Sequence, residues 1–162
     1  MLSTFLSAQY TKTAACKDQA FDRKVNSYLS YSAPVISVVA AHANKSQMVF
    51  LDAREYAEYK ISHIPGARYV GYDDFDIKSI KDLATKSNIV VYCSIGYRSE
   101  KIATKLKKEG YTNVYNLYGS LFEWANEGFE LTDNNEQKTK KIHTYNKSWS
   151  KWVLNPTNVK VW

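Results

Sequence analysis

Cysteine is scarce in this sequence, and long apolar runs are absent. The 162 residues contain only Cys16 and Cys93. Two cysteines cannot form the disulfide framework of a small secreted domain, which needs several bridges. A single bridge between them stays open as an alternative, although it would block the thiol of Cys93. No apolar run approaches the roughly 18 residues that a membrane-spanning helix requires, so we predict no membrane span.

Arginine-rich stripes and known nucleic-acid-binding motifs are also missing, although the formal net charge is +6. From residue 132 onward, six lysines stand against two acidic residues, so most of the positive excess belongs to the tail. The pattern favours a solvated basic surface, with attraction of small anions as the second interpretation. We therefore predict no nucleic-acid partner. With 44% hydrophobic and 23% charged residues, the composition is typical of a folded globular chain.

The first nine residues resemble the end of a secretory signal, with an apolar stretch followed by a small residue, Ala8, at a possible cleavage point. They lack the positively charged start of such a signal and are too few to form a complete one. A frayed terminus is the alternative. The pattern favours a truncated signal, and with it a periplasmic or secreted location over a cytoplasmic one.

Short apolar runs alternate with helical patterns through the middle of the chain. Strands are predicted at residues 35–36, 48–51, 68–70, 89–92 and 113–117, and helices at 17–30, 38–43, 55–59, 77–86, from 99 to just before Gly110, and 121–127. This alternation predicts an α/β fold with a parallel sheet of about five strands, flanked by helices on both faces. Ligands of such sheets bind outside the carboxyl ends of the strands.

The stretch from Val90 to Ser99 places Cys93 between a predicted strand and a predicted helix. Loop amides and the helix dipole favour an anion at that position, which lowers the pKa of a thiol and makes the reactive thiolate available. The alternative is a buried, inert thiol. Gly96 and Arg98 in the same loop favour the reactive interpretation. Cys16, in a polar N-terminal stretch, is expected to have no specific role.

Three ordered motifs resemble those of the rhodanese family of sulfurtransferases. The central loop matches the pattern C-x-x-G-x-R-S in Cys93-Ser-Ile-Gly96-Tyr-Arg98-Ser99. The N-terminal signature is matched by Leu51-Asp-Ala-Arg54, Glu58-Tyr59 and His63-Ile-Pro-Gly-Ala67, and the C-terminal signature by Asn116-Leu-Tyr-Gly119, Trp124 and Gly128. Two positions depart from the family pattern, because Ser62 and Ser120 stand where glycine is usual.

The resemblance covers about residues 35–131 and implies a single rhodanese-like domain. It leaves an N-terminal extension, residues 1–34, and a basic C-terminal extension, residues 132–162, with Trp149, Trp152 and Trp162. Aromatic residues at that density favour packing against the domain over a partner surface. His143 has no second ligand nearby in the sequence, so the tail gives no support for a metal site.

The chemistry implied by the resemblance is transfer of a sulfane sulfur from a small anionic donor such as thiosulfate. The Cys93 thiolate would carry the sulfur as a persulfide and pass it to cyanide, a thiol or a protein acceptor. The persulfide would lie in a nest of loop amides formed by Ser94, Ile95, Gly96, Tyr97, Arg98 and Ser99. No cofactor and no metal are implied, and a monomer is expected.

Several neighbouring residues have more than one interpretation. Arg98 could bind the anionic oxygens of the donor or brace the loop, and Tyr97 could tune access of the acceptor or be incidental. Asp52 and Arg54 are expected to form a buried ion pair that shapes the wall of the site. His63 is expected to be structural, because an ionised thiol needs no general base.

Two other functions use the same loop. A cysteine phosphatase needs C-x5-R, whereas the spacing from Cys93 to Arg98 is C-x4-R, one residue shorter and better suited to a sulfur atom than to a phosphoryl group. The second is a non-catalytic docking or sulfur-carrier module, which retention of Cys93, Gly96 and Arg98 disfavours.

Overall fold

A five-stranded parallel sheet forms the centre of the computed structural model, which describes residues 10–162. The strands lie in the order β1-β5-β4-β2-β3, and all four neighbouring pairs are parallel. Their bounds are β1 Val35–Ile36, β2 Val49–Asp52, β3 Arg68–Tyr69, β4 Ile89–Tyr92 and β5 Val114–Leu117. The predicted α/β class and sheet are confirmed, with shifts of one residue at some strand ends, where assignments are least sharp.

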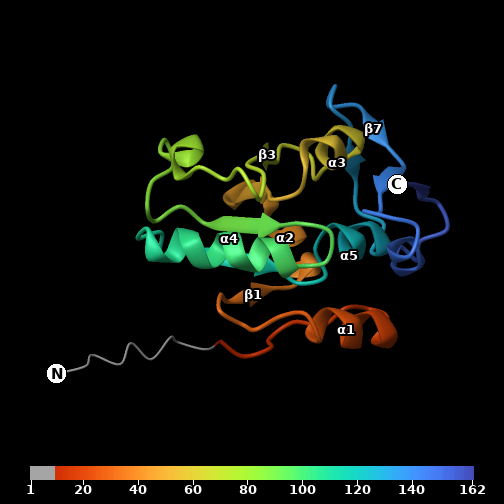
Figure 1. Cartoon of the computed structure of the whole chain (residues 1–162), viewed down its shortest axis with the longest axis horizontal. Coiled ribbons are helices and arrows are strands. Elements are labelled where there is room, and N and C mark those ends of the chain that lie inside the picture. Colours follow the sequence, from red (N-terminus) through yellow and green to blue (C-terminus); the bar gives the residue numbers. More distant parts are fainter. Residues whose placement is uncertain (1–9) are drawn as a thin grey trace.

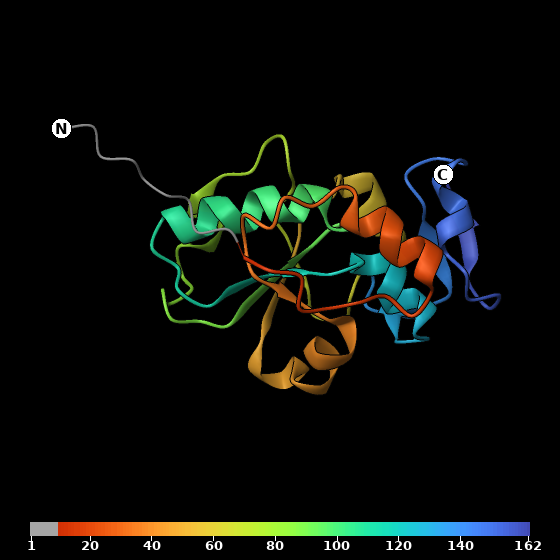
Figure 2. The ribbon, with the colours of Figure 1, turned by 90° about the horizontal axis from the view of Figure 1, so that it is seen from below.

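Helices cover both faces of this sheet: α1 Gln19–Asn26, α2 Val38–Ala43, α3 Tyr56–Ile61, α4 Tyr97–Lys108 and α5 Ser120–Asn126. Successive side chains of a strand point to opposite faces. Accordingly, Val90 and Tyr92 of β4 join the apolar cluster of α1, α2 and α5, whereas Ile89 and Val91 join that of α4. Figure 2 shows α2 and α4 on opposite sides of the strands.

Side-chain caps explain where the first two helices begin. The Asp18 carboxylate accepts a hydrogen bond from the Phe21 amide at 2.8 Å, and the Ser37 hydroxyl accepts one from the Ala40 amide at 3.2 Å, as predicted for Ser37. Helix α1 ends well before residue 30. After α1 the chain leaves the helical path, because the Ser30 amide and hydroxyl both donate to Glu100 of α4, at 3.0 and 3.1 Å.

The helix predicted at residues 77–86 is wrong in extent. Only a short 3₁₀ helix, η2 Ile77–Ile80, forms there. The Ile80 carbonyl accepts from the Leu83 amide at 2.9 Å, a three-residue spacing, and from the Tyr111 hydroxyl at 3.1 Å. In an α-helix the Ile80 carbonyl would instead accept from the amide four residues later. A tertiary contact therefore overrides the local helical pattern.

The C-terminal extension adds two small sheets beside α3 and α5 (Figure 1). Strands β6 Leu131–Thr132 and β7 Lys138–Thr139 are antiparallel, and β8 Lys141–His143 and β9 Val159–Val161 are parallel. The short helices η1 Lys45–Gln47 and η3 Trp149–Trp152 complete the elements. Ile142 and Val153 are buried in the apolar cluster that contains Phe21, whereas Trp162 is 58% exposed.

Helix length bears on the membrane question. Across residues 10–162, α4 is the longest helix at 12 residues, and none is long and apolar enough to cross a bilayer. The signal-like pattern in residues 1–9 lies outside the described residues.

Candidate active site

Cys93 follows β4 directly, at the carboxyl edge of the central sheet. Three residues later, Gly96 adopts a φ of 124°, a backbone conformation that side chains rarely permit, and α4 begins at Tyr97. This reversal folds the loop back over the cysteine. The Cys93 side chain is consequently almost buried, with 1% of its surface exposed.

The sulfur atom of Cys93 is surrounded by groups that favour its anion. The Gly96 amide donates to Sγ at 3.2 Å, and the Ser99 hydroxyl oxygen lies 3.5 Å away. Burial by itself raises the pKa of a thiol. The positive charge of Arg98 and the hydrogen bonds from Ser99 and Gly96 outweigh burial here and hold the pKa of Cys93 below its ordinary value. The environment is therefore suited to a thiolate near neutral pH.

Asn116 on β5 holds the far side of this loop. Its side chain is fully buried, its amide donates to the Gly96 carbonyl at 3.0 Å, and its Oδ1 accepts from the Ser99 hydroxyl at 2.7 Å. Ser99 has one hydroxyl hydrogen, which can serve either Asn116 or the sulfur. The shorter distance gives the bond to Asn116 priority, so the Gly96 amide is the principal donor to the sulfur.

Ser120 explains one departure from the family pattern. Its hydroxyl accepts from the Cys93 amide at 3.1 Å and donates to the Leu117 carbonyl at 3.0 Å. Its φ of 50° lies in the left-handed region, where glycine is common. The amides of the next two residues, Leu121 and Phe122, donate to the carbonyls of Cys93 and Ser94, both at 3.1 Å. The start of α5 thus fixes the backbone of the nucleophile.

Arg98 is held by Glu58 of α3 rather than projecting freely into the site. Its guanidinium donates to both Glu58 oxygens, at 2.7 and 3.0 Å, and to the Ser94 hydroxyl at 3.0 Å. Glu58 is 2% exposed, and Arg98 lowers the pKa of this carboxyl in spite of burial. Of the two interpretations of Arg98, the geometry favours bracing. Sequence reasoning placed Glu58 only within a motif and missed its contact with the loop.

Asp52 and Arg54 form the expected buried ion pair, with both side chains fully enclosed. The guanidinium donates to Asp52 at 2.6 and 2.9 Å and to the Ser62 carbonyl at 2.7 Å, which ties the end of β2 to the end of α3. Neither residue lines the pocket described below. The pair therefore supports the site from behind instead of forming its wall. Position 62 does not require glycine, because the φ of Ser62 is −168°, an extended backbone conformation that any residue can adopt.

His63 is held by Tyr59 and Glu136. Its ring stacks on Tyr59 with centroids 3.9 Å apart, Nδ1 lies 3.0 Å from the Tyr59 carbonyl, and Nε2 lies 3.2 Å from Glu136. It does not line the pocket over Cys93. This placement fits the structural role expected for His63.

Cys16 occupies a different environment from the one expected. It is 7% exposed and belongs to the apolar cluster that includes Trp124, so its surroundings are apolar and not polar. Burial, and then the negative charge of Glu123, raise the pKa of its thiol. Both cysteines are free, so no bridge blocks Cys93.

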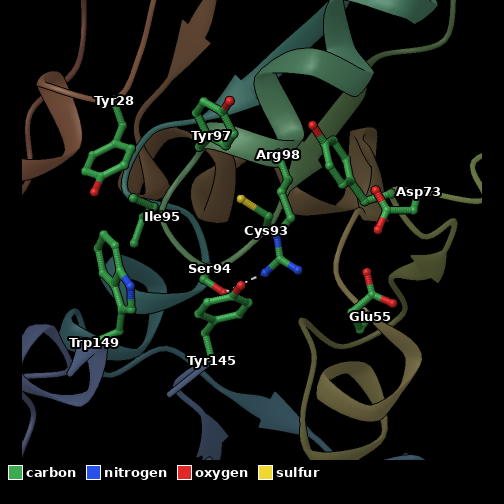
Figure 3. Close-up of a pocket in the computed structure, with 11 residues that line it drawn as sticks. Tyr28, Glu55, Asp73, Cys93, Ser94, Ile95, Tyr97, Arg98, Tyr145 and Trp149 are labelled. Carbon is green, nitrogen blue, oxygen red and sulfur yellow. Dashed lines mark hydrogen bonds between the residues drawn. The ribbon is translucent and has the colours of Figure 1, made fainter. Parts of the chain in front are cut away.

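A pocket of about 540 Å³ opens over Cys93 (Figure 3). Five residues of the predicted loop line it: Cys93, Ser94, Ile95, Tyr97 and Arg98. Gly96 and Ser99 do not line it and act through the backbone and hydrogen bonds described above. Six further lining residues were missed by the sequence analysis: Tyr28, Glu55, Tyr72, Asp73, Tyr145 and Trp149.

The C-terminal extension has two roles at this pocket. Trp149 packs in part against the apolar cluster of α1, α2 and α5, as its aromatic density favoured, and it also faces the pocket. Tyr145 faces the pocket with 57% of its surface exposed. The density of aromatic residues in the tail was the one available sequence signal for this role.

Known proteins share the central part of this chain. A family model described as "Rhodanese-like domain" matches residues 36–127. A solution structure of a rhodanese-like domain from Anabaena superposes with a TM-score of 0.59 at 22% identity, over 66% of this chain and 84% of that one, which supports the fold.

Two curated relatives also match part of this chain. A tRNA uridine(34) hydroxylase of Pectobacterium carotovorum is 35% identical over 92 residues, which are 54% of this chain and 26% of that protein. A Bacillus subtilis protein named "Putative sulfur carrier protein YrkF" is 30% identical over 65% of this chain and 60% of its own length. The chain thus spans about a quarter of the first of these relatives. With its sheet, its cysteine loop and the family match over more than half its length, the chain belongs to the rhodanese-like domain family.

Proposed function

We propose that this protein is a sulfurtransferase that moves a sulfane sulfur from a donor such as thiosulfate to cyanide or a thiol through a persulfide on Cys93. The observation that supports this proposal is the environment of the Cys93 sulfur. Cys93 lines the pocket, its sulfur lies 3.2 Å from the Gly96 amide, and Arg98 and hydrogen bonds lower its pKa. A nucleophilic thiol in such a setting is suited to covalent catalysis.

The first half-reaction needs no proton transfer. The Cys93 thiolate forms a sulfur–sulfur bond with the outer sulfur of thiosulfate, the bond between the two donor sulfurs breaks, and its electron pair leaves with sulfite. In the second half-reaction, cyanide or a thiolate attacks the outer sulfur of the persulfide and Cys93 leaves as the thiolate. No group beyond the thiol takes or gives a proton, which agrees with a pocket that His63 does not line.

The tight loop supports sulfur over phosphate as the transferred group. The Gly96 amide already contacts Sγ directly, and the Gly96 carbonyl is tied to Asn116 at 3.0 Å. A loop closed in this way suits one added sulfur atom, whereas a phosphoryl group needs a ring of amides wide enough for three oxygens. This geometry supports the C-x4-R argument against a phosphatase.

The test is thiocyanate formation from thiosulfate and cyanide by the wild type, Cys93→Ser and Cys16→Ser. We expect turnover and a one-sulfur mass adduct in the wild type and in Cys16→Ser, and neither in Cys93→Ser. Absence of both from the wild type with every small donor would overturn the proposal. Turnover of an aryl phosphate that is lost in Cys93→Ser would favour a phosphatase instead.

The similarity to the sulfur carrier relative favours one alternative, a carrier module that loads sulfur but passes it only to a protein. The same experiment separates the two functions. A stable one-sulfur adduct on Cys93 that neither cyanide nor small thiols remove would identify the carrier.

A further inference from the structure

Glu100 of α4 is a buried carboxylate whose hydrogen-bond donors come from one short segment of the N-terminal extension. Its side chain is fully buried, and within residues 10–162 it takes part in no ion pair. Oε2 accepts from the Ser30 amide and hydroxyl at 3.0 and 3.1 Å, and Oε1 accepts from the Ser32 amide at 3.1 Å. A buried charge needs partners of this kind. We call residues 27–32, which supply them, the clamp segment.

The clamp segment is held in one position along α4. The Ser32 and Thr104 hydroxyl oxygens lie 2.8 Å apart, which adds a second attachment to the helix. Tyr31 has a φ of 56°, in the left-handed region that a bulky residue rarely adopts. Such a conformation persists only where the surrounding contacts hold it. In Figure 2 the chain after α1 runs along α4 before it enters β1, in agreement with these contacts.

Tyr28 of the clamp segment lines the pocket over Cys93. Its ring meets Tyr97 and Trp149 edge to face, with centroids 6.2 and 5.5 Å apart. Figure 3 shows Tyr28, Ile95 and Trp149 on the same side of Cys93. Tyr28 thus joins a residue of the cysteine loop to one of the C-terminal extension, and together they close one side of the pocket.

Leu29 of the clamp segment covers the cysteine loop itself. A Cβ atom added at Gly96 would lie 3.4 Å from Leu29 Cδ2, so the leucine packs directly over this glycine. The Gly96 amide is the group that donates to the Cys93 sulfur. Both residues that reach the site lie directly before Ser30 and outside residues 36–127. The N-terminal extension is therefore part of the site, and Glu100 fixes its position.

We infer that Glu100 is a positioning residue that holds Tyr28 and Leu29 over the cysteine loop and so limits the size of the molecules that reach Cys93. Glu100 does not line the pocket and acts only through the clamp segment. The biological sense of this restriction rests on the proposed persulfide cycle. A persulfide that waits for its acceptor is lost to any thiol that reaches it, so a narrow opening protects the loaded sulfur.

Iodoacetamide and its N-adamantyl derivative are the probes, because they share the reacting group and are both uncharged but differ greatly in size. Peptide mass spectrometry gives the rate constant for alkylation of Cys93 by each reagent. The measured quantity is the adamantyl-to-plain ratio of these rate constants, divided by the ratio in the wild type. Intrinsic reactivity and any change in the thiolate fraction cancel in this quotient, which therefore reports access alone.

Two substitutions loosen the clamp segment, and each has a matched control. Glu100→Gln should raise the ratio about tenfold, because hydrogen bonds to a charged group are worth at least that factor. Ser30→Ala, which removes one donor of three, should raise it about threefold. The controls are Glu109→Gln, at the exposed residue after α4, and Ser27→Ala, whose hydroxyl donates to the Lys24 carbonyl. Both should stay within about twofold of the wild type on the same scale.

A double-mutant cycle separates positioning from a general loosening of the fold. Tyr28→Ala removes the side chain that Glu100 is inferred to hold, so it should raise the ratio by itself. Since the two residues act on the same opening, Glu100→Gln combined with Tyr28→Ala should raise the ratio by less than the product of the two single effects. Far-ultraviolet circular dichroism and thermal unfolding show whether each variant is folded. If Glu100→Gln does not fold, the same cycle with Ser30→Ala decides.

Three results would overturn the inference: an unchanged ratio in the folded clamp variants, an equal rise in the matched controls, or a double variant that gives the full product. The alkylation experiment requires no sulfur transfer, so its outcome is independent of turnover. A wild type that shows the expected ratios but forms no persulfide from any donor would contradict the proposed function and leave the role of Glu100 in access intact.

Discussion

The Glu58 carboxylate binds the Arg98 guanidinium through two hydrogen bonds of 2.7 and 3.0 Å, beside the loop of the nucleophile. Both side chains are largely buried, so removing one charge leaves the other without its partner in a poorly solvated site. We expect Glu58→Gln to lower the free energy of unfolding by about 1–3 kcal/mol, since the amide keeps some hydrogen bonding. Urea denaturation measures the change, with Glu109→Gln, at the exposed residue that follows α4, as the control. A stability equal to that of the control would contradict this account of the pair.

Arg98 also sets the protonation of Cys93. Its positive charge is the largest contribution that lowers the pKa of the thiol against the effect of burial. In Arg98→Gln that pKa should rise, so the thiolate should appear only at higher pH. The rate of Cys93 alkylation by iodoacetamide can be measured by mass spectrometry as a function of pH. The rise of this rate with pH should move to higher pH in Arg98→Gln. At neutral pH the alkylation rate should fall about tenfold for each unit of that upward shift. A profile that coincides with the wild type would show that Arg98 is purely structural.

Ser120 offers a pair of substitutions with opposing effects. Ser120→Ala removes the acceptor of the buried Cys93 amide and keeps a side chain at a φ of 50°. It should cost about 1–3 kcal/mol of unfolding free energy. Ser120→Gly loses the same hydrogen bond but relieves the left-handed backbone, which is worth about 1–2 kcal/mol. This relief exceeds the roughly 0.4–1 kcal/mol that glycine's freer unfolded state costs. Denaturation should rank wild type above Ser120→Gly and Ser120→Gly above Ser120→Ala. An alanine variant as stable as the wild type would refute the role of the hydroxyl.

Cys16 should be chemically silent in the folded protein. It does not line the pocket over Cys93, and burial raises the pKa of its thiol, whereas Cys93 lines that pocket and has a lowered pKa. One thiol per chain should therefore react quickly with a disulfide reagent at neutral pH, and both should react in denaturant. The fast reaction should persist in Cys16→Ser and vanish in Cys93→Ser. Fast labelling of Cys16 in the native state would contradict the raised pKa of its thiol.

Glu55 and Asp73 should discriminate against doubly charged donors. Neutralising either by Glu55→Gln or Asp73→Asn should raise kcat/KM for thiosulfate about two- to fivefold, because one repulsive charge leaves the pocket. The gain should be smaller for the singly charged methanethiosulfonate and should shrink at high salt, since both side chains are solvent-accessible. Equal gains for both donors would argue against a charge effect. Asp133→Asn in the tail, away from the pocket lining, serves as the control.

Local patterns were sufficient for the central sheet and the cysteine loop. The apolar run at β4, Gly96 and the amphipathic spacing of α4 are short-range features, so the strand, the reversal and the helix could be predicted with little error. The same was not true of residues 77–86. Their helical pattern was overridden by the Tyr111 hydroxyl, which reaches the Ile80 carbonyl from a distant part of the chain.

The sequence by itself determined the family, the parallel sheet and the position of Cys93 at the carboxyl end of a strand. Only the tertiary structure decided that Glu58 pairs with Arg98, that Ser120 accepts from the Cys93 amide, and that Tyr28, Tyr145 and Trp149 line the pocket. The physical reason is range. Periodicity and loop motifs report contacts within a few residues, whereas an ion pair or a pocket wall depends on where separate elements meet after the core has packed.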